Sequence, residues 1–247
     1  SNGTLASGGH LTLGSNASQT AYTKLTGAAV ITGEVTVERY LGARRAYRHL
    51  STSVSGGTVY DNWQEGGSSQ AGYGLFITGP GSTAAGFDAT AQISPSLFTL
   101  NATSGAFDEI GNTQITALEA GKGYRLYVRG DRTINLNSNS AVPTPTVLRS
   151  KGTLQQTDFA VTDLNQNLNG WSLVGNPHQN QFNLQTVLNA STGLNKNYVW
   201  VWDPYVNTRG AYVIVDVTAN TNNVSGSQAN RTLLAGESVM VRTTAAA

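Results

Sequence analysis

The stretch Leu118–Arg129 reads Leu-Glu-Ala-Gly-Lys-Gly-Tyr-Arg-Leu-Tyr-Val-Arg, and a related stretch returns near the end of the chain. That second stretch, Leu233–Arg242, reads Leu-Leu-Ala-Gly-Glu-Ser-Val-Met-Val-Arg. In both, an Ala-Gly pair follows a leucine and leads into β-branched or aromatic residues, the pattern of a glycine turn that feeds a β-strand. The recurrence predicts a duplicated unit.

The sequence ahead of each Ala-Gly turn supports the duplication. In the first half, Ser96–Leu100 and Ala106–Ile110 are predicted to form a hairpin, and in the second half Tyr198–Trp202 and Ala211–Val215 are predicted to form another. Their loops are rich in Asn, Asp, Gly and Pro, which tolerate turn dihedrals. We therefore expect the two hairpins to occupy equivalent places in two related β units.

The remaining chain extends this interpretation to an all-β protein with two related β-sandwich-like halves and an N-terminal layer of short strands. Residues 1–41 predict that layer, built either as a flat sheet or as solenoid-like rungs. Glu34–Leu41 alternates, which places Val35 and Val37 on one face. Pro143 and Pro145 mark a linker, so the halves are expected at 42–142 and 143–247. Further strands are predicted at Ala21–Leu25, Gly72–Thr78 and Asp158–Val161.

Composition excludes several classes of protein. Charged residues make up 12% of the chain and the net charge is +1, so neither nucleic-acid binding nor attraction to an anionic membrane is supported. The absence of cysteine removes disulfides, thiolate catalysis and cysteine-ligated zinc. No apolar run approaches the ~20 residues that a membrane-spanning helix needs, and no membrane insertion is expected.

No catalytic residue, metal or cofactor is predicted. His10, His49 and His178 lie far apart in the sequence, and none has a second ligand at metal-site spacing, so each is interpreted as a surface or hydrogen-bonded residue. The serine nucleophile elbow and the phosphate-binding and dinucleotide-binding motifs are absent from the sequence. Arg129-Gly130-Asp131 spells an integrin-binding tripeptide, but three residues match by chance too often to carry weight. Whether calcium binds is left open.

The most charged stretch is Glu38–His49, in which arginines and tyrosines interleave. Arginine favours bidentate pairs with carboxylates, and carboxylates are present in the same half, so we expect a structural ion-pair network rather than a nucleic-acid surface. The predicted members of the network are Glu38, Arg39, Arg44, Arg45, Arg48, Asp61, Glu65, Arg125 and Arg129.

One strand carries the strongest candidate for a binding surface. Tyr198, Trp200 and Trp202 alternate with valines and therefore share one strand face. Flat aromatic rings stack on the apolar faces of sugars, so these three residues are predicted as a glycan-binding face. The alternative is a strand buried on both faces, for which the rings are core residues.

Five short motifs occur along the chain: Glu38–Leu41, Tyr47–Val54, Asp61–Gly66, Gly123–Arg132 and Trp171–Pro177. Together they resemble a recurrent β-rich region of large secreted surface proteins of the Bacteroidota, which are typically cargo of the type nine secretion system. The resemblance covers most of the chain from about Gly33, and it implies an extracellular passenger region with no assigned catalytic residues. The family usually has proline where Ser53 stands and Tyr-Pro where His178-Gln179 stands. The C-terminal sorting domain expected of such cargo is missing, which is interpreted as cleavage on export or as an excerpt.

The combined expectation is a non-enzymatic, extracellular structural or adhesive protein of the cell surface, with a self-assembling filament subunit as one form of it. Expected partners are further copies of the chain, other surface proteins, or glycans. A carbohydrate-binding module and a non-catalytic part of a larger secreted enzyme stay open as alternatives.

Overall fold

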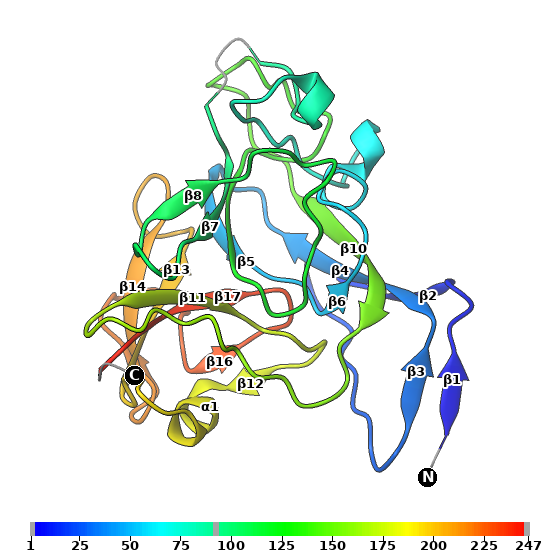
Figure 1. Ribbon diagram of the computed structural model, residues 1–247. Coiled ribbons are helices and arrows are strands. Elements are labelled where there is room, and N and C mark those ends of the chain that lie inside the picture. Colours follow the sequence, from blue (N-terminus) through cyan, green and yellow to red (C-terminus); the bar gives the residue numbers. More distant parts are fainter. Residues whose placement is uncertain (1–2, 91–93, 245–247) are drawn as a thin grey trace.

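The computed structural model describes residues 3–90 and 94–244 and confirms a mainly β fold (Figure 1). The first half is built on an antiparallel sheet, called here the first sheet, whose strand order is β5-β9-β7-β8. Its strands are β5 (Ala46–Leu50), β9 (Tyr124–Val128), β7 (Leu97–Leu100) and β8 (Phe107–Glu109).

The second half is built on an antiparallel sheet with the order β11-β17-β13-β14-β15, called here the second sheet. Position for position, its first four strands follow the order of the first sheet, and the hairpins β7–β8 and β13–β14 occupy equivalent places. The strands are β11 (Trp171–Gly175), β17 (Ser238–Arg242), β13 (Tyr198–Asp203), β14 (Ala211–Asp216) and β15 (Thr221–Asn222).

The two Ala-Gly turns meet where the two sheets join. Gly121 and Gly236 both adopt a φ of 77°, a left-handed conformation that favours glycine. The backbone N–H of Gly175, at the end of β11, donates to the carbonyl of Gly121 at 2.9 Å, while Ser51 after β5 donates to Gly236 at 3.0 Å. Each turn therefore supports the end of a strand in the other half.

A third sheet, ordered β2-β4-β10-β6, connects the N-terminal layer to the first half. Pairing of β10 with β4 and β6 places β10 in this sheet, although the predicted boundary at 143 assigned it to the second half. The linker prolines precede a strand that returns to the N-terminal layer before the chain enters the second sheet. The strands are β2 (Leu11–Leu13), β4 (Glu34–Leu41), β10 (Thr146–Leu154) and β6 (Val54–Ser55), and beside them β1 (Thr4–Ala6) pairs with β3 (Val30–Thr32).

The two halves bury their cores in different ways. In the first half, Leu50 and Leu126 of the first sheet pack with Leu41 and Leu148 of the third sheet and with loop residues such as Trp63. In the second half, the helix α1 (Leu184–Ala190) covers one face of the second sheet, together with the short pair β12 (Phe182–Asn183) and β16 (Thr232–Leu233). Single 3₁₀ turns, η1 (Glu65–Gly67) and η2 (Thr83–Ala85), lie in the loops of the first half.

Candidate functional site

The arginines of the predicted network have partners other than the predicted carboxylates. Among the described residues, no ion pair joins two members of that network: Arg39 pairs with Glu237 of the second half, and Glu65 pairs with Arg149 of β10 at 2.5 Å. Arg44, Arg45 and Arg48 donate to loop carbonyls instead, and burial lowers the pKa of Arg48 to about 10. Glu38 and Asp61 accept from Ser15 and Thr58.

Arg125 of β9 occupies the centre of an aromatic cluster. Its guanidinium carbon lies 4.2 Å from the ring centroid of Tyr47, 4.9 Å from that of Phe107 and 5.0 Å from that of Trp202. Trp202 belongs to the second sheet, so both halves form this cage. Each such cation–π contact contributes ~0.5–2 kcal/mol, depending on desolvation. Within the described part of the chain, no hydrogen bond or ion pair to the Arg125 side chain is present, and its Nε is buried.

His49 is the buried member of the same cluster. It faces Arg125 across the β5–β9 pair, and its ring stacks on Trp202 with centroids 5.5 Å apart and planes inclined by 25°. Burial, with a further contribution from the positive charge of Arg125, lowers the pKa of His49 to about 3, so the ring is neutral at physiological pH. His49 is 5% exposed, and neither ring nitrogen has a hydrogen-bond partner among the residues that the structure describes, which corrects its interpretation as a surface or hydrogen-bonded residue.

The three residues of the predicted glycan-binding face lie on one face of β13 but differ in exposure. Tyr198 is 41% exposed, whereas Trp200 and Trp202 are half-buried. Trp171 packs edge-on against Trp200 with centroids 4.5 Å apart, and Tyr212 packs edge-on against Trp202 at 4.9 Å. The three rings therefore do not form a flat exposed platform.

The aromatic surface continues over neighbouring strands. Tyr212 and Ile214 of β14 lie opposite Trp202 and Trp200, and each is 36% exposed. On the other side of the cage, Arg129 lies 4.8 Å and Arg209 lies 5.9 Å from the ring of Tyr127. We call this set, which covers the buried His49, the aromatic–arginine surface; its members are Tyr47, Phe107, Arg125, Tyr127, Arg129, Tyr198, Trp200, Trp202, Arg209, Tyr212 and Ile214.

Comparison with models of known protein families, with curated proteins and with solved structures finds no match for this chain. Among the described residues, no helix is long and apolar enough to cross a membrane, and no cluster of three or more His, Cys, Asp or Glu side chains is arranged to hold a metal ion.

The integrin tripeptide is not available as a recognition loop. Asp131 is 4% exposed, and its carboxylate accepts from the backbone of Gly72 at 2.6 Å and from the hydroxyl of Thr133 at 2.7 Å. The motif is therefore a structural part of the first half.

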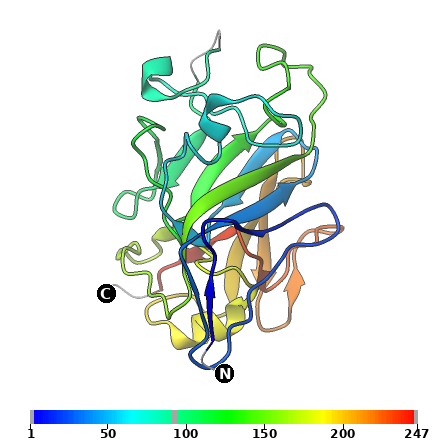
Figure 2. The same ribbon diagram turned by 90° about the vertical axis from the view of Figure 1, so that its right-hand side faces the viewer.

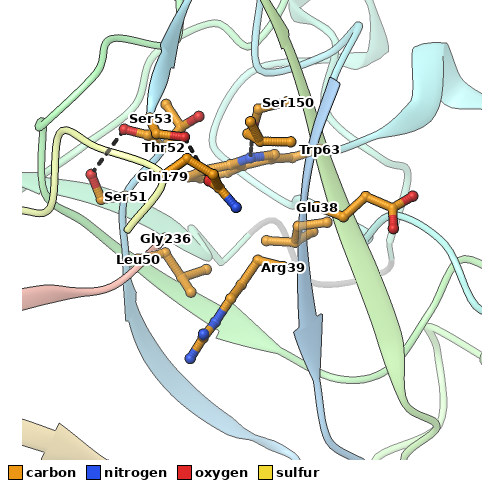
Figure 3. A pocket seen from close by; sticks show the side chains of 12 residues that line it. Glu38, Arg39, Leu50, Ser51, Thr52, Ser53, Trp63, Ser150, Gln179 and Gly236 are labelled. Carbon is orange, nitrogen blue, oxygen red and sulfur yellow. Dashed lines mark hydrogen bonds between the residues drawn. The ribbon is translucent and has the colours of Figure 1, made fainter. Parts of the chain in front are cut away.

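Ser53, just ahead of β6, contacts Gln179, which follows β11. Ser53 donates to the side-chain carbonyl of Gln179 at 2.7 Å, and both residues are buried (Figure 3). They line a small cavity of about 10 Å³ together with Arg39, Trp63 and Ser150. This buried side-chain hydrogen bond joins the first half to the second.

The Ala-Gly turn of the first half lines a larger cleft of about 300 Å³. Its wall includes Thr99, Leu173 and the irregular segment 159–164, and Glu119 and Lys122 contribute an ion pair of 2.8 Å between largely exposed side chains. Its volume is at the lower end of the range for small-molecule sites.

Only part of the candidate site is predicted from the sequence. Tyr198, Trp200 and Trp202 are predicted as a surface and Arg125 as a structural residue, but the contact between Arg125 and Trp202 is not predicted. Tyr47 and His49 are two residues apart on β5 and therefore share one face of the strand. Arg125 and Tyr127 have the same spacing on β9. The alternation of aromatic and basic residues on both strands was the available signal.

Proposed function

We propose that this protein is a non-enzymatic, extracellular adhesive protein of the cell surface, and that its aromatic–arginine surface binds acidic glycans. The observation that carries the proposal is Arg125, a guanidinium held by rings from both halves and, within residues 3–90 and 94–244, without a carboxylate partner. Among the described residues no group accepts a hydrogen bond from this guanidinium, so its terminal nitrogens keep their donors for an incoming anion, while Nε is buried.

A uronic-acid polymer matches the chemistry of this surface. Its carboxylates accept charge-assisted hydrogen bonds from Arg125 and the neighbouring Arg129 and Arg209, while the apolar faces of its sugars stack on the exposed parts of Tyr198 and Tyr212. The extracellular setting is supported by the resemblance to secreted Bacteroidota surface proteins and agrees with a chain without cysteine.

The test is retention of the purified chain on immobilised polygalacturonate, with neutral dextran as the reference polymer. We expect binding to polygalacturonate that weakens as salt rises. Arg125→Met preserves the bulk of the side chain inside the cage and is expected to lower the affinity at least about tenfold, because a hydrogen bond to a charged group contributes ~1.5–3 kcal/mol.

Arg231→Met is the matched control. Arg231 bonds to Gln185 and to the carbonyl of Val217, away from the aromatic–arginine surface, so its loss removes the same charge without touching the proposed site. Equal losses for the two variants, or no retention of the unmodified chain, contradict the proposal. Thermal unfolding of both variants separates lost binding from lost folding.

A further inference from the structure

Residues 4–41 fold into two stacked, bent rungs of parallel strand. β1 pairs in parallel with β3, and after a bend β2 pairs in parallel with β4. The outer rung is therefore β1–bend–β2 and the inner rung is β3–bend–β4 (Figures 1 and 2). Ser7 fixes the two bends to each other, because its N–H donates to Thr32 at 2.9 Å and its hydroxyl donates to Glu34 at 2.6 Å.

Like residues lie above like residues in this stack. The register places Leu11 over Val35 and Leu13 over Val37, and these side chains extend the apolar cluster that contains Val54 and Leu154. On the alternate face, Thr12 lies over Thr36. In-register ladders of similar residues between parallel bent strands are typical of a β-solenoid, in which each rung is stable only when another covers it.

The inner side of the stack is closed. β10 pairs along β4, and the side chain of Gln156 imitates a strand beside β3. The Gln156 side-chain oxygen accepts from the N–H of Ile31 at 2.7 Å, and its amide nitrogen donates to the Ile31 carbonyl at 2.8 Å. On this side, both strands of the inner rung therefore have partners.

The outer side of the stack is open. Val30 donates to the carbonyl of Gly3 and Ser7 donates to Thr32, so alternation directs the backbone groups of Thr4 and Ala6 away from β3. All three residues of β1 are exposed, and Leu5, which lies over Ile31, is 54% exposed. In Figure 2, β1 lies at the surface of the molecule facing the viewer.

This edge lacks the charge and the proline that often protect a free strand, although the two strands that form it have only three residues each. The first charged residue of the chain is Lys24, and no proline precedes Pro80. In contrast, β8 carries Asp108 and Glu109, and the edge strands β6 and β15 have only two residues each. Proteins usually protect exposed edges with charge, proline or short length, so an uncharged bent edge is suited to pairing.

We propose that the open edge of β1 and β2 docks the terminal rung of a parallel β-solenoid. The occupant is a strand–bend–strand segment of protein that runs parallel to β1 and β2 and places apolar residues over Leu5, Leu11 and Leu13. Continuity with the existing rung-to-rung pairing supports this choice. A second copy of the chain offers, among its described residues, no other parallel bent rung with a free edge, and pairing of two such edges about a two-fold axis is antiparallel.

The test is a chain that carries one additional rung, made by inserting a tandem copy of residues 4–29 ahead of Thr4. We expect hydrogen exchange at the amides of Thr4 and Ala6 to slow at least tenfold and the melting temperature to rise. The control insertion replaces the copied Leu5 and Thr12 with proline, which cannot donate in a ladder, and it is expected to change neither quantity.

Three results overturn the proposal. The first is exchange that is equally fast in the chains with the additional rung and with the proline control. The second is slow exchange at these amides in the unmodified monomer. The third is a dimer of the unmodified chain, seen by light scattering, in which the same amides are protected, since the occupant is then a second copy. None of these results depends on the glycan-binding role of Arg125.

Discussion

The first and second sheets have the same strand order over four strands, but different segments cover their buried faces. This difference separates the strand order, which the alternating strands determine, from the covering segments, which differ between the halves. In the first half, the loops that contain Trp63, Leu75 and Ile77 close the core. In the second half, α1 closes it through Leu184 and Leu188. The alternating strands set the sheet order, whereas insertions of different length and composition supply the cover.

The covering segments of the two halves are also stabilised by different interactions. Arg132, 3% exposed, organises the loop cover: it donates to the carbonyls of Gly67, Ser68 and Leu75 and pairs with Asp88 at 2.8 Å. The helical cover depends on apolar burial. We therefore expect the first half to depend on one buried charge and the second half to depend on packing.

Arg132→Met is predicted to have the largest effect on stability. It leaves the Asp88 carboxylate largely buried without its charged partner and frees the three carbonyls, so the free energy of unfolding is expected to fall by ~3–5 kcal/mol. Urea unfolding followed by tryptophan fluorescence measures the change. A loss below ~1 kcal/mol contradicts the assigned role of Arg132.

Leu188→Ala tests the cover of the second half. Leu188 is 2% exposed in the core against the second sheet, and its truncation is expected to lower the free energy of unfolding by about 3 kcal/mol through lost burial and the cavity that remains. The neighbouring Val187 is 42% exposed on the same helix, so Val187→Ala is the control and is expected to change stability by less than ~0.5 kcal/mol. Similar losses for the two variants contradict this account of the cover.

Much of the sheet framework follows from the sequence, because strands with one buried face alternate visibly. Val35 and Val37 of β4 are buried as their alternation predicts, and the predicted hairpins form β7–β8 and β13–β14. The predicted strand at Gly72–Thr78 does not form a regular ladder. Scattered backbone bonds, such as that from the N–H of Leu75 to the carbonyl of Trp63 at 2.8 Å, take the place of a ladder. Side chains accept from two further amides: Ile77 donates to Asp88 at 2.8 Å and Thr78 donates to Ser96 at 2.9 Å. Propensity indicates an extended chain here but not its partner.

Two other predicted strands, Ala21–Leu25 and Asp158–Val161, lie in irregular segments, and β1 was not predicted. Each is short, so its state depends on long-range contacts such as that between the N–H of Thr23 and the carbonyl of Gln179 at 2.7 Å. The candidate site was harder to predict for the same reason. The cage around Arg125 forms only when Trp202 of the second sheet packs against the first sheet. No residue spacing in the sequence predicts that contact.

The buried His49 distinguishes the meeting point of the halves by its response to acid. Its pKa is lowered to about 3 in the folded chain, while the unfolded chain keeps an ordinary value near 6.5, so between these values the unfolded state binds the additional proton. Stability is therefore constant with respect to this group above about pH 6.5 and falls below it, with a limiting slope of ~1.4 kcal/mol per pH unit.

We expect His49→Phe, which retains a ring against Trp202, to lose less stability than the unmodified chain between pH 6.5 and pH 5, by about 2 kcal/mol. Urea unfolding at a series of pH values gives the difference directly, and titrating groups common to both chains cancel. The control is His10→Phe, because His10 is exposed and its replacement is expected to leave the profile unchanged. Parallel profiles for the His49 variant and the unmodified chain contradict burial of a neutral imidazole.

The two Ala-Gly turns give the finest comparison, since Gly121 and Gly236 share a φ of 77° but differ in their surroundings. An added Cβ at Gly121 lies 2.7 Å from the ring of Phe159 and 3.1 Å from the Pro177 side chain, whereas at Gly236 the nearest atom belongs to the flexible Arg39 side chain at 3.2 Å. Alanine strains the left-handed backbone by ~1–2 kcal/mol at either site, so this contribution cancels when the two variants are compared. The remaining difference is overpacking, and Gly121→Ala is expected to exceed Gly236→Ala by about 1 kcal/mol in lost unfolding free energy. Equal losses of unfolding free energy, measured by urea unfolding, contradict this prediction. They mean that the segment around Phe159 moves aside as easily as the Arg39 side chain does.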